Sequence, residues 1–363
     1  MTRQNQEALG EEVILAEQHD AAGRHDEAIN VLARATGQGD VEAMTRLGKR
    51  LVLGDRAPFL PHDGARFLID AANKGGAEAT ARLAVMSATG AYVTQNWKEA
   101  LEILIVAAER GWAAARGQLC VLATDRELAA EACADEKPDR DIWRRLGADI
   151  DLSTWTSSPP GETLNVEPLI RSFTGFATKE VCNWIIGLSS GRLERARVYD
   201  SLEGKESVSN TRTNTTAVFN LMETDLVHLL IQARMEAACG VPVANMEAAA
   251  VLHYAVGEEI DDHYDFVDPK SPNYEQEIAQ NGQRVITFLV YLNGDYTGGE
   301  TDFPRLDISH KGESGEGLFF VNALPSGEPD LRTAHAGRAL LKGEKWILSQ
   351  FIRNRPVLRV AAA

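Results

Sequence analysis

The stretch 285–292, VITFLVYL, is a continuous apolar run rich in β-branched and aromatic residues, a composition that favours a β-strand. Three further strand candidates lie around it: AAAVLHYAV (248–256), GLFFVNAL (317–324) and KWILSQFIR (345–353). Two helices are expected earlier in this part of the chain, around 179–189 and 223–239, where apolar residues recur at helical spacing. Short strands separated by Gly and Pro turns, with few helices, predict a sandwich or jelly roll.

A candidate metal site lies among these strands. His263 and Asp265 stand two residues apart in HYDF, and residues i and i+2 of a strand point to the same face. Such a pair alone is more often a surface hydrogen bond than a metal site. A third candidate, His335, stands 72 residues later, just before another predicted strand. Two imidazoles and one carboxylate form the facial triad that holds non-haem Fe(II) and leaves coordination positions open.

Lys345 lies ten residues after His335, at the start of the last predicted strand. It is expected to point into a largely apolar barrel, where a lysine is costly unless it meets an anion. A dicarboxylate co-substrate would supply that anion. The alternative is an exposed lysine at the strand end, because the GEK stretch (343–345) that it closes is turn-like.

The first third of the chain contains an internal repeat of 36 residues. Three segments align without a gap, each with apolar and small residues at helical spacing followed by a glycine that suits a helix C-terminus. The coinciding positions are Leu32, Leu68 and Leu104; Ala35, Ala71 and Ala107; Gly39, Gly75 and Gly111; Ala43, Ala79 and Ala115; and Leu47, Leu83 and Leu119. This pattern predicts stacked helical hairpins, an α-solenoid in which each unit buries its apolar face against its neighbours.

The repeat pattern decays after Ala123, and two segments rich in Pro, Ser and charge follow, DEKPDRD (135–141) and STWTSSPPGET (153–163). The predicted organisation is a helical repeat domain over 1–135, a linker over 136–163 and a catalytic domain over 164–358. The predicted fold class is therefore α+β with two domains: an α-solenoid followed by a double-stranded β-helix, or jelly roll, with flanking helices.

Composition limits the partners. The 363 residues contain 37 Lys and Arg against 53 Asp and Glu, a formal net charge of −16, which argues against nucleic acid or an anionic membrane as the main partner. The four cysteines lack metal-binding spacing, the N-terminal residues do not read as a signal peptide, and no apolar run approaches a membrane span. We therefore expect a cytoplasmic protein with buried or idle thiols.

Two resemblances to known families rest on these motifs. LHYAVGEEIDDHYDF (252–266), QRVITFLVYLNGDYTGGETDFP (283–304) and HAGRALLKGEKWILSQFIR (335–353) resemble the 2-oxoglutarate- and Fe(II)-dependent dioxygenases of the prolyl 4-hydroxylase alpha-subunit type. The likeness extends over roughly 165–356 and includes the GGET–FP stretch. The repeats over roughly 20–125 resemble Sel1-like repeats, relatives of the tetratricopeptide repeat. That second resemblance implies either a surface for a protein or peptide partner or a spacer or dimerisation element.

The first resemblance implies a role for each matching residue. His263, Asp265 and His335 would bind Fe(II), and Lys345 would pair with the distal carboxylate of 2-oxoglutarate. Further residues would complete the pocket: Tyr254 at the same carboxylate, Thr287 beside it, and Arg212, in NTRTN, either facing the substrate or exposed in a loop. Dioxygen would be the second co-substrate, with ascorbate as reductant. The segments 198–214 and 267–283 are candidate lids, with plain surface loops as the alternative.

The chain also departs from the family pattern. Ile260 stands where many prolyl hydroxylases have a tyrosine near the substrate, and Phe351 stands where a tryptophan is common. Neither change affects the predicted iron ligands, but both weaken the case for a collagen-like substrate. Of the other histidines, His253 is predicted to be structural and His310 to be exposed.

The resulting hypothesis is an enzyme that hydroxylates a C–H of a peptidyl or free amino-acid residue, with proline as the preferred target, while 2-oxoglutarate is decarboxylated to succinate. One alternative is the same chemistry on a small biosynthetic intermediate. Another is an interaction scaffold in which the repeats carry the function and the barrel is a relic.

Overall fold

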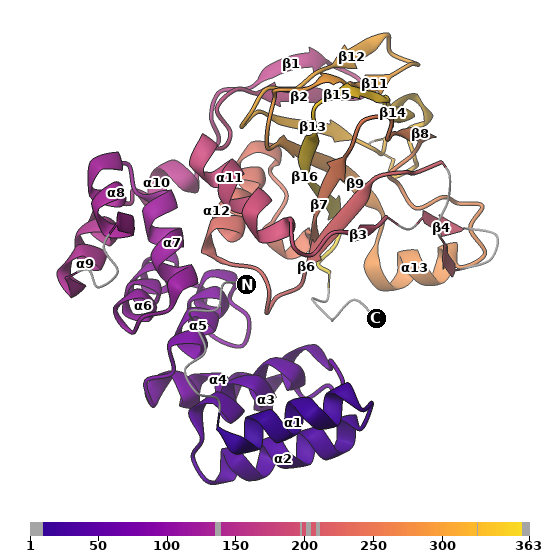
Figure 1. Ribbon diagram of the computed structural model, residues 1–363. Coiled ribbons are helices and arrows are strands. Elements are labelled where there is room, and N and C mark those ends of the chain that lie inside the picture. The colour runs from indigo at the N-terminus through magenta and orange to yellow at the C-terminus, as the bar shows by residue number, and fades with distance from the viewer. Residues whose placement is uncertain are drawn as a thin grey trace. The chain divides into compact units, whose positions relative to one another are not determined.

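The protein is described by a computed structural model that covers residues 10–134, 139–196, 198–200, 205–207, 211–324 and 326–357. The chain divides into two compact units. The first comprises Met1–Leu152 with Leu221–Leu229 and Val360–Ala363, and the second comprises Ser153–Asn220 with Leu230–Arg359. Helical hairpins precede a region of antiparallel sheets, which confirms the predicted fold class (Figure 1).

The predicted solenoid is present as a series of helical hairpins in the first unit (Figure 1). Within the described residues its helices are α1 (Glu11–Ala21), α2 (His25–Gly37), α3 (Val41–Leu53), α4 (Pro61–Asn73), α5 (Ala77–Thr89), α6 (Trp97–Glu109), α7 (Ala113–Leu122), α8 (Arg126–Ala134) and α9 (Arg140–Asp149). The three aligned repeats correspond to the pairs α2–α3, α4–α5 and α6–α7. Each pair joins two helices through a short turn.

The positions that coincide in the repeat have the same structural role in each copy. Leu32, Leu68 and Leu104 are at most 1% exposed. The glycines at 39, 75 and 111 have φ of 93°, 99° and 96°, a left-handed conformation that glycine adopts without steric cost. In each copy two backbone N–H groups turn back to carbonyls of the preceding helix, as in a Schellman motif. The 36-residue period therefore reflects a repeated helix ending.

Helices α3 and α4 approach closely because two glycines face each other. A Cβ added at Gly64 would lie 2.6 Å from the carbonyl oxygen of Gly48, and one added at Gly48 would lie 2.9 Å from that of Gly64. Any larger side chain at either position would hold the two helices further apart.

The second unit contains an antiparallel β-structure built mainly from two sheets. The larger sheet has the strand order β1-β2-β13-β9-β16-β7-β6-β3, and the smaller has the order β12-β11-β14-β8. The strands of the larger sheet are β1 (Glu162–Asn165), β2 (Ile170–Phe173), β13 (Gly317–Val321), β9 (Arg284–Tyr291), β16 (Lys345–Arg353), β7 (Ala249–Tyr254), β6 (Thr215–Phe219) and β3 (Glu194–Arg195). Those of the smaller sheet are β12 (Ile308–His310), β11 (Thr301–Phe303), β14 (His335–Gly337) and β8 (Ile260–His263).

Two short ribbons complete the strands within the described residues. One pairs β10 (Thr297–Gly298) with β15 (Leu340–Lys342), and the other pairs β4 (Val198–Asp200) with β5 (Lys205–Ser207). The four strands predicted from the sequence correspond to β7, β9, β13 and β16.

The core of the second unit lies between the two sheets. It is formed by buried side chains of both: Ile170, Leu289, Tyr291, Phe303, Leu318, Phe320 and Ile347. The outer face of the larger sheet has a second cluster of four packed rings, Phe173, Phe176, Phe288 and Phe319. Successive residues of β9 and β13 point alternately to the inner and the outer face, as expected for strands that are covered on both sides.

Helices cover that outer face. Helix α11 (Lys179–Ser189) has the predicted bounds, and α12 (Leu226–Cys239) begins three residues later than predicted. Gln232 of α12 donates a buried 2.8 Å hydrogen bond to Gln350 of β16, which fixes this helix to the sheet.

The predicted linker, 136–163, contains regular structure. It includes α9 and the short helix α10 (Leu152–Trp155), and β1 begins at its end. The apolar residues of this stretch explain the helices, because Ile142, Trp143, Leu146 and Trp155 are all buried. The domain bounds themselves stay predictions.

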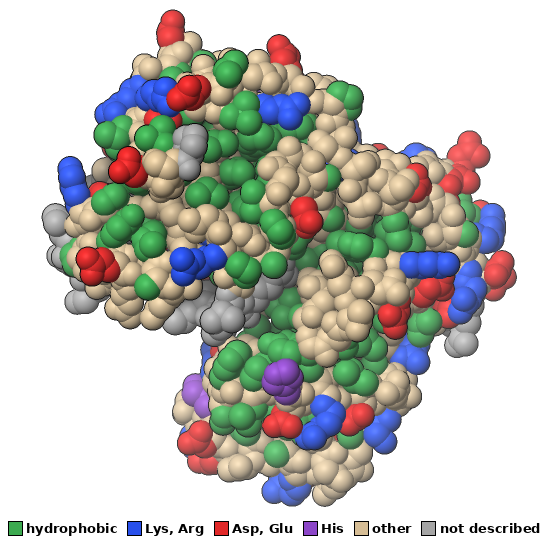
Figure 2. Space-filling model, turned by 180° about the vertical axis from the view of Figure 1, so that it is seen from behind, with side chains coloured by type: hydrophobic (Ala, Val, Ile, Leu, Met, Phe, Trp, Pro, Cys, Tyr) green, Lys and Arg blue, Asp and Glu red, His purple; other side chains and the backbone are tan. Residues whose placement is uncertain are grey.

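The surface that Figure 2 shows has acidic and basic side chains interspersed among apolar ones. Among the described residues, no helix is both long enough and apolar enough to cross a bilayer.

Candidate active site

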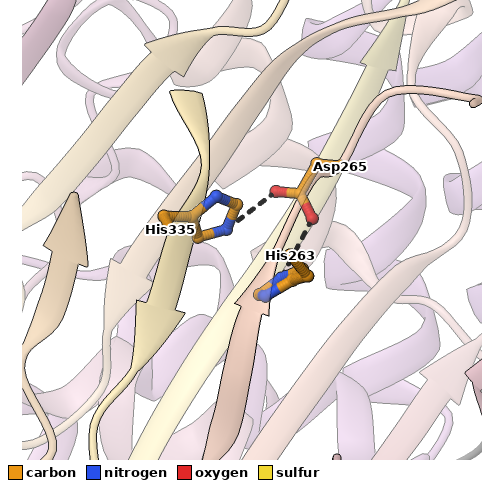
Figure 3. Close-up of side chains that lie close together, drawn as sticks. All are labelled: His263, Asp265 and His335. Atoms are coloured by element: carbon orange, nitrogen blue, oxygen red, sulfur yellow. Dashed lines mark ion pairs between the residues drawn. The ribbon is translucent and has the colours of Figure 1, made fainter. Parts of the chain in front are cut away.

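The side chains of His263, Asp265 and His335 point toward one another (Figure 3). One ligand atom of each lies within 4.8 Å of the others. His263 is the last residue of β8 and His335 the first residue of β14, and the two are directly opposite in the antiparallel pair. The two rings pack on each other with centres 4.3 Å apart, and the Asp265 carboxylate lies beside both, with Oδ1 3.4 Å from Nε2 of His263 and Oδ2 3.3 Å from Nε2 of His335.

The position of Asp265 in the chain's local structure differs from the predicted one. Strand β8 ends at His263, so Asp265 lies in the bend beyond it rather than on the same strand face. Within the pairing of β8 with β14, Asp261 and Asp262 together face Ala336 alone, which is a β-bulge. Bulges re-aim side chains next to active sites, and this one places Ile260 and His263 on the same side of the strand.

Backbone carbonyls orient both imidazoles. Nδ1 of His335 lies 3.0 Å from the carbonyl oxygen of Thr333, and Nδ1 of His263 lies 2.8 Å from that of Asp261. A carbonyl only accepts, so each Nδ1 carries a proton, and Nε2 is the nitrogen left to bind a metal. Both Nε2 atoms are on the side of Asp265. This is the arrangement that metal-binding histidines show in proteins.

The electrostatics of the three residues favour a cation. Burial alone would raise the pKa of Asp265, but the neighbouring His335 and His263 hold the pKa well below the usual value for a carboxyl. Burial opposes the charged form of His335, yet Asp265 raises the pKa of that imidazole. The site thus holds a desolvated carboxylate that has two imidazoles as its main partners. A divalent ion between these donors would satisfy all three, and the donor set suits Fe(II).

Lys345 forms a second polar site inside the same barrel. It is the first residue of β16, is 2% exposed, and pairs across the sheet with Tyr254, the last residue of β7. Its Nζ donates to the carbonyl of Gly299 and lies 5.2 Å and 5.9 Å from the ring centres of Tyr254 and Tyr291. Burial lowers the pKa of Lys345 to about 7. The alternative of an exposed strand-end lysine is therefore excluded.

This surrounding fits an anionic co-substrate. Within the described part of the chain, no carboxylate is in ion-pair contact with Lys345. A buried ammonium without a counter-charge is costly, and one carboxylate of a dicarboxylate would remove that cost. Lys345 and Tyr254 would hold 2-oxoglutarate at this end, while its other end would reach the metal.

The neighbourhood of Tyr254 is kept open by a glycine. Tyr254 is buried together with Tyr296 and Leu340, and burial raises its pKa to about 12, so the phenol stays protonated. A Cβ on Gly337 would lie 2.9 Å from Ile260 and 3.7 Å from the Tyr254 hydroxyl. Ile260 packs against this same cluster. The departure at position 260 therefore adds an apolar wall beside Tyr254.

The two remaining predicted residues lie in different places. Arg212 is half-buried, forms a β-bridge with Ile260 and donates from Nε to Asn214 at 3.0 Å, so it lies close to the site. Thr287, predicted beside the co-substrate carboxylate, has its hydroxyl 2.7 Å from Oδ2 of Asp265. That hydroxyl contacts a predicted metal ligand rather than Lys345. The roles proposed for both residues stay predictions.

The prediction for His310 is wrong. It is half-buried at the end of β12, with Nε2 3.1 Å from Glu316 and its ring 5.7 Å from that of Tyr291. The small sheet packs this edge against Tyr291, which the loop-like sequence did not indicate. His253 lies away from the metal site: its ring packs on Trp346 at 4.4 Å and Nδ1 is 3.2 Å from the Thr215 hydroxyl.

The two candidate lids contain different elements. The first, 198–214, contains the ribbon of β4 and β5, and its residues 201–204 and 208–210 lie outside the described residues. The other, 267–283, contains the helix α13 (Tyr274–Asn281). An ion pair of 2.7 Å joins Glu277 of this helix to Arg353 of β16, and Gln283 bonds to both the N–H and the carbonyl of Val267. This segment is thus tied to the sheet at its base.

One functional candidate was missed by the sequence analysis. Asn322, directly after β13, is fully buried and contacts Thr287. The sequence feature that points to Asn322 is a single amide within the apolar run GLFFVNAL, because a buried polar side chain needs a specific partner.

Comparisons with known proteins agree with this geometry. A family model described as the 2OG-Fe(II) oxygenase superfamily matches residues 249–353. Probable prolyl 4-hydroxylase 10 of Arabidopsis thaliana is 30% identical over 212 residues, covering 53% of this chain and 71% of that protein. Prolyl 4-hydroxylase subunit alpha-1 of Gallus gallus is 31% identical over 189 residues, covering 52% of this chain. The chain spans 36% of the length of that subunit.

Among solved structures, a Sel1 repeat protein from Oxalobacter formigenes is similar to this chain with 19% identity and a TM-score of 0.30, covering 40% of this chain and 60% of that one. The helical hairpins themselves are established by the bounds and buried positions given above.

The fold and site define a jelly-roll protein with a His–Asp–His constellation beside a buried lysine. The chain belongs to the prolyl 4-hydroxylase family of the 2OG-Fe(II) oxygenase superfamily.

Proposed function

We propose that this protein hydroxylates a proline C–H, in a peptide or in the free amino acid, using Fe(II), dioxygen and 2-oxoglutarate. The observation that carries the proposal is the convergence of His263, Asp265 and His335 in the barrel that also buries Lys345. When bound, iron and 2-oxoglutarate supply the oxidising chemistry, in which 2-oxoglutarate is converted to succinate.

The chain's own residues hold and orient the reactants. His263, Asp265 and His335 would provide three ligands and leave the remaining positions for co-substrates. Lys345, with the Tyr254 phenol beside it, would fix the far carboxylate of 2-oxoglutarate and so set the direction from which it reaches the metal. Phe303 and Phe320, whose ring centres lie 5.5 Å and 4.7 Å from that of His335, keep water from one side of the site.

The substrate side of the proposal rests on the family. The relatives' names specify prolyl 4-hydroxylases, which favours proline as the target. Arg212, half-buried beside Ile260, is the residue we propose to face the substrate. The helical repeats would offer a surface to a peptide or protein partner.

Two finer points belong to the same proposal. Ascorbate would act as the reductant that keeps iron in its divalent state. We also propose a cytoplasmic location, because Cys120, Cys133, Cys182 and Cys239 are all free thiols, as is usual in a reducing compartment.

The test is hydroxylation of a panel of short peptides with proline in varied contexts, alongside free proline. The proposal predicts the gain of one oxygen atom on proline, seen by mass spectrometry, with one succinate formed per hydroxyl. His263→Ala should abolish both products, whereas His310→Ala, a histidine away from the metal site, should retain them. Succinate formation driven only by a small non-amino-acid metabolite would overturn the substrate assignment. An absence of turnover with folded, iron-loaded protein would instead favour the scaffold alternative.

A further inference from the structure

A chain of three buried side chains leads away from the proposed metal site. The hydroxyl of Thr287 donates to Oδ2 of Asp265 at 2.7 Å, and Nδ2 of Asn322 donates to the Thr287 hydroxyl at 2.9 Å. Thr287 and Asn322 are both 0% exposed, and Asp265 is 7% exposed. The chain connects the bend after β8 to β9 and to the end of β13.

The chemistry of the groups fixes the direction of this chain. An ionised carboxylate only accepts hydrogen bonds, so the single proton of the Thr287 hydroxyl must point to Asp265. The hydroxyl oxygen is then left as an acceptor, and only the NH₂ end of the Asn322 amide can satisfy it. The orientation of this amide is therefore determined by its partners.

Asn322 is itself held by the backbone. Its N–H donates to the carbonyl of Val285 at 2.8 Å, and its carbonyl accepts from the N–H of Asp330 at 2.9 Å. Thr333, whose hydroxyl bonds to the Asp330 carbonyl at 2.7 Å, presents its own carbonyl to His335. The hydrogen bonds around Asp330 thus support two of the three predicted metal ligands: Asp265, through Asn322 and Thr287, and His335, through Thr333.

Without such support, the carboxylate of Asp265 is free to rotate about its last side-chain bond. It would then offer one oxygen or both to an ion. The hydroxyl of Thr287 engages Oδ2, which leaves Oδ1, on the His263 side, available. Hydrogen bonds to metal ligands of this kind raise metal affinity by fixing the ligand's orientation.

We propose that Thr287 and Asn322 are positioning residues that lock the Asp265 carboxylate into presenting a single oxygen to the metal, with Asn322 acting only through Thr287. This inference rests on the proposed function, since it assumes that the His–Asp–His cluster binds a divalent ion. It also gives Thr287 a role different from the co-substrate contact predicted from the family resemblance.

The test uses Co(II) as a spectroscopic probe of the full-length protein, with affinity and coordination read from its visible absorption. Thr287→Val, which keeps the shape but removes the hydroxyl, should weaken Co(II) binding about 10- to 100-fold. Thr287→Ser restores a hydroxyl and should bind close to wild type. Asn322→Leu should weaken binding less than Thr287→Val does.

The double variant Thr287→Val/Asn322→Leu decides the mechanism. Because Asn322 is proposed to act through Thr287, the double variant should bind Co(II) no more weakly than Thr287→Val alone. A matched control is Thr301→Val, which removes another buried hydroxyl, 2.8 Å from the Tyr291 hydroxyl, that does not contact the cluster. It should retain wild-type affinity.

Thermal melts in EDTA separate positioning from folding. The proposal expects the metal-free melting temperature of Thr287→Val to fall no further than that of Thr301→Val. Unchanged Co(II) affinity in Thr287→Val, or additive losses in the double variant, would overturn the positioning role. A wild-type protein that binds no Co(II) would instead refute the proposed function.

Discussion

The burial of Lys345 couples its protonation to the binding of a carboxylate. Its ammonium is enclosed by two tyrosine rings and a single carbonyl, and burial lowers its pKa to about 7. Without a bound anion, Lys345 is therefore partly neutral near neutral pH. A bound carboxylate favours the charged form and raises the pKa again.

This coupling predicts proton uptake on binding 2-oxoglutarate. At about pH 8 most of the lysine is neutral, so binding should take up nearly one proton, whereas at about pH 6 it should take up almost none. Above a pH of about 7 the affinity should fall as pH rises, because the neutral form must first be protonated. Calorimetry of the Co(II)-loaded protein in buffers of different ionisation enthalpy measures the uptake.

The matched control for this measurement is Lys345→Met, which has similar length but no charge. It should bind 2-oxoglutarate more weakly and show no uptake that depends on pH. Equal uptake at the two pH values in the wild-type protein would contradict the assignment of Lys345.

The site residues that lie in short sequence motifs could be predicted. His263, Asp265, His335 and Lys345 stood out from spacing and residue type. The contact between Thr287 and Asp265 was not predictable, because it joins positions 22 apart through a bend that the sequence does not define. Asn322 was missed for a similar reason, since its partner lies on a different strand.

At the scale of elements, the close packing of α3 and α4 leads to a prediction about stability. Gly64→Val should destabilise the helical unit, because even a Cβ there would meet the backbone nitrogen of Val52 at 2.7 Å and the Gly48 carbonyl at 2.6 Å. Overpacking of this kind costs about 1–3 kcal/mol. Urea unfolding followed by circular dichroism measures the loss.

The control is Gly37→Ala in α2, where an added Cβ meets nothing within 4 Å. It should leave stability unchanged or raise it, because alanine favours helix more than glycine. A Gly64→Val variant as stable as Gly37→Ala would show that α3 and α4 do not pack as closely as described.

A second prediction concerns α7 and α8. The sulfur atoms of Cys120 and Cys133 lie 2.8 Å apart, and Cys133 is exposed. Burial raises the pKa of Cys120 to about 12, which keeps this thiol unreactive on its own. The expectation of idle thiols thus fits a reducing environment but not an oxidising one.

Treatment with the thiol oxidant diamide should convert this pair to a disulfide. Two thiols are lost while diamide takes up two electrons and two protons. Peptide mapping should recover a linked Cys120–Cys133 peptide, and the closed loop should stabilise the helical unit by about 3 kcal/mol. Cys133→Ser should not yield this peptide. Recovery of both thiols free in the oxidised wild-type protein would contradict the geometry.

Elements were predicted best where the pattern is periodic or strongly apolar. The hairpins follow from the 36-residue period, and β9 and β16 from their runs of apolar residues. The predicted linker instead contains α9 and α10, because the Pro, Ser and charged residues of this stretch outnumber the buried Trp143 and Trp155. The half-buried His310 was misplaced because short edge strands such as β12 carry little sequence signal.

At the scale of the whole molecule, a family domain is combined with helical repeats in one chain. The family assignment rests on the second unit, in which the matched residues 249–353 lie. What the repeats bind was not predictable, because a solenoid pattern defines a shape and not a ligand.

The most direct measurement is an anaerobic titration of the metal-free protein with Fe(II) and then 2-oxoglutarate, followed by visible spectroscopy. The account predicts a metal-to-ligand charge-transfer band that is absent in His263→Ala and that needs a higher 2-oxoglutarate concentration in Lys345→Ala. A folded, iron-loaded wild-type protein that gives no band at any 2-oxoglutarate concentration would contradict it.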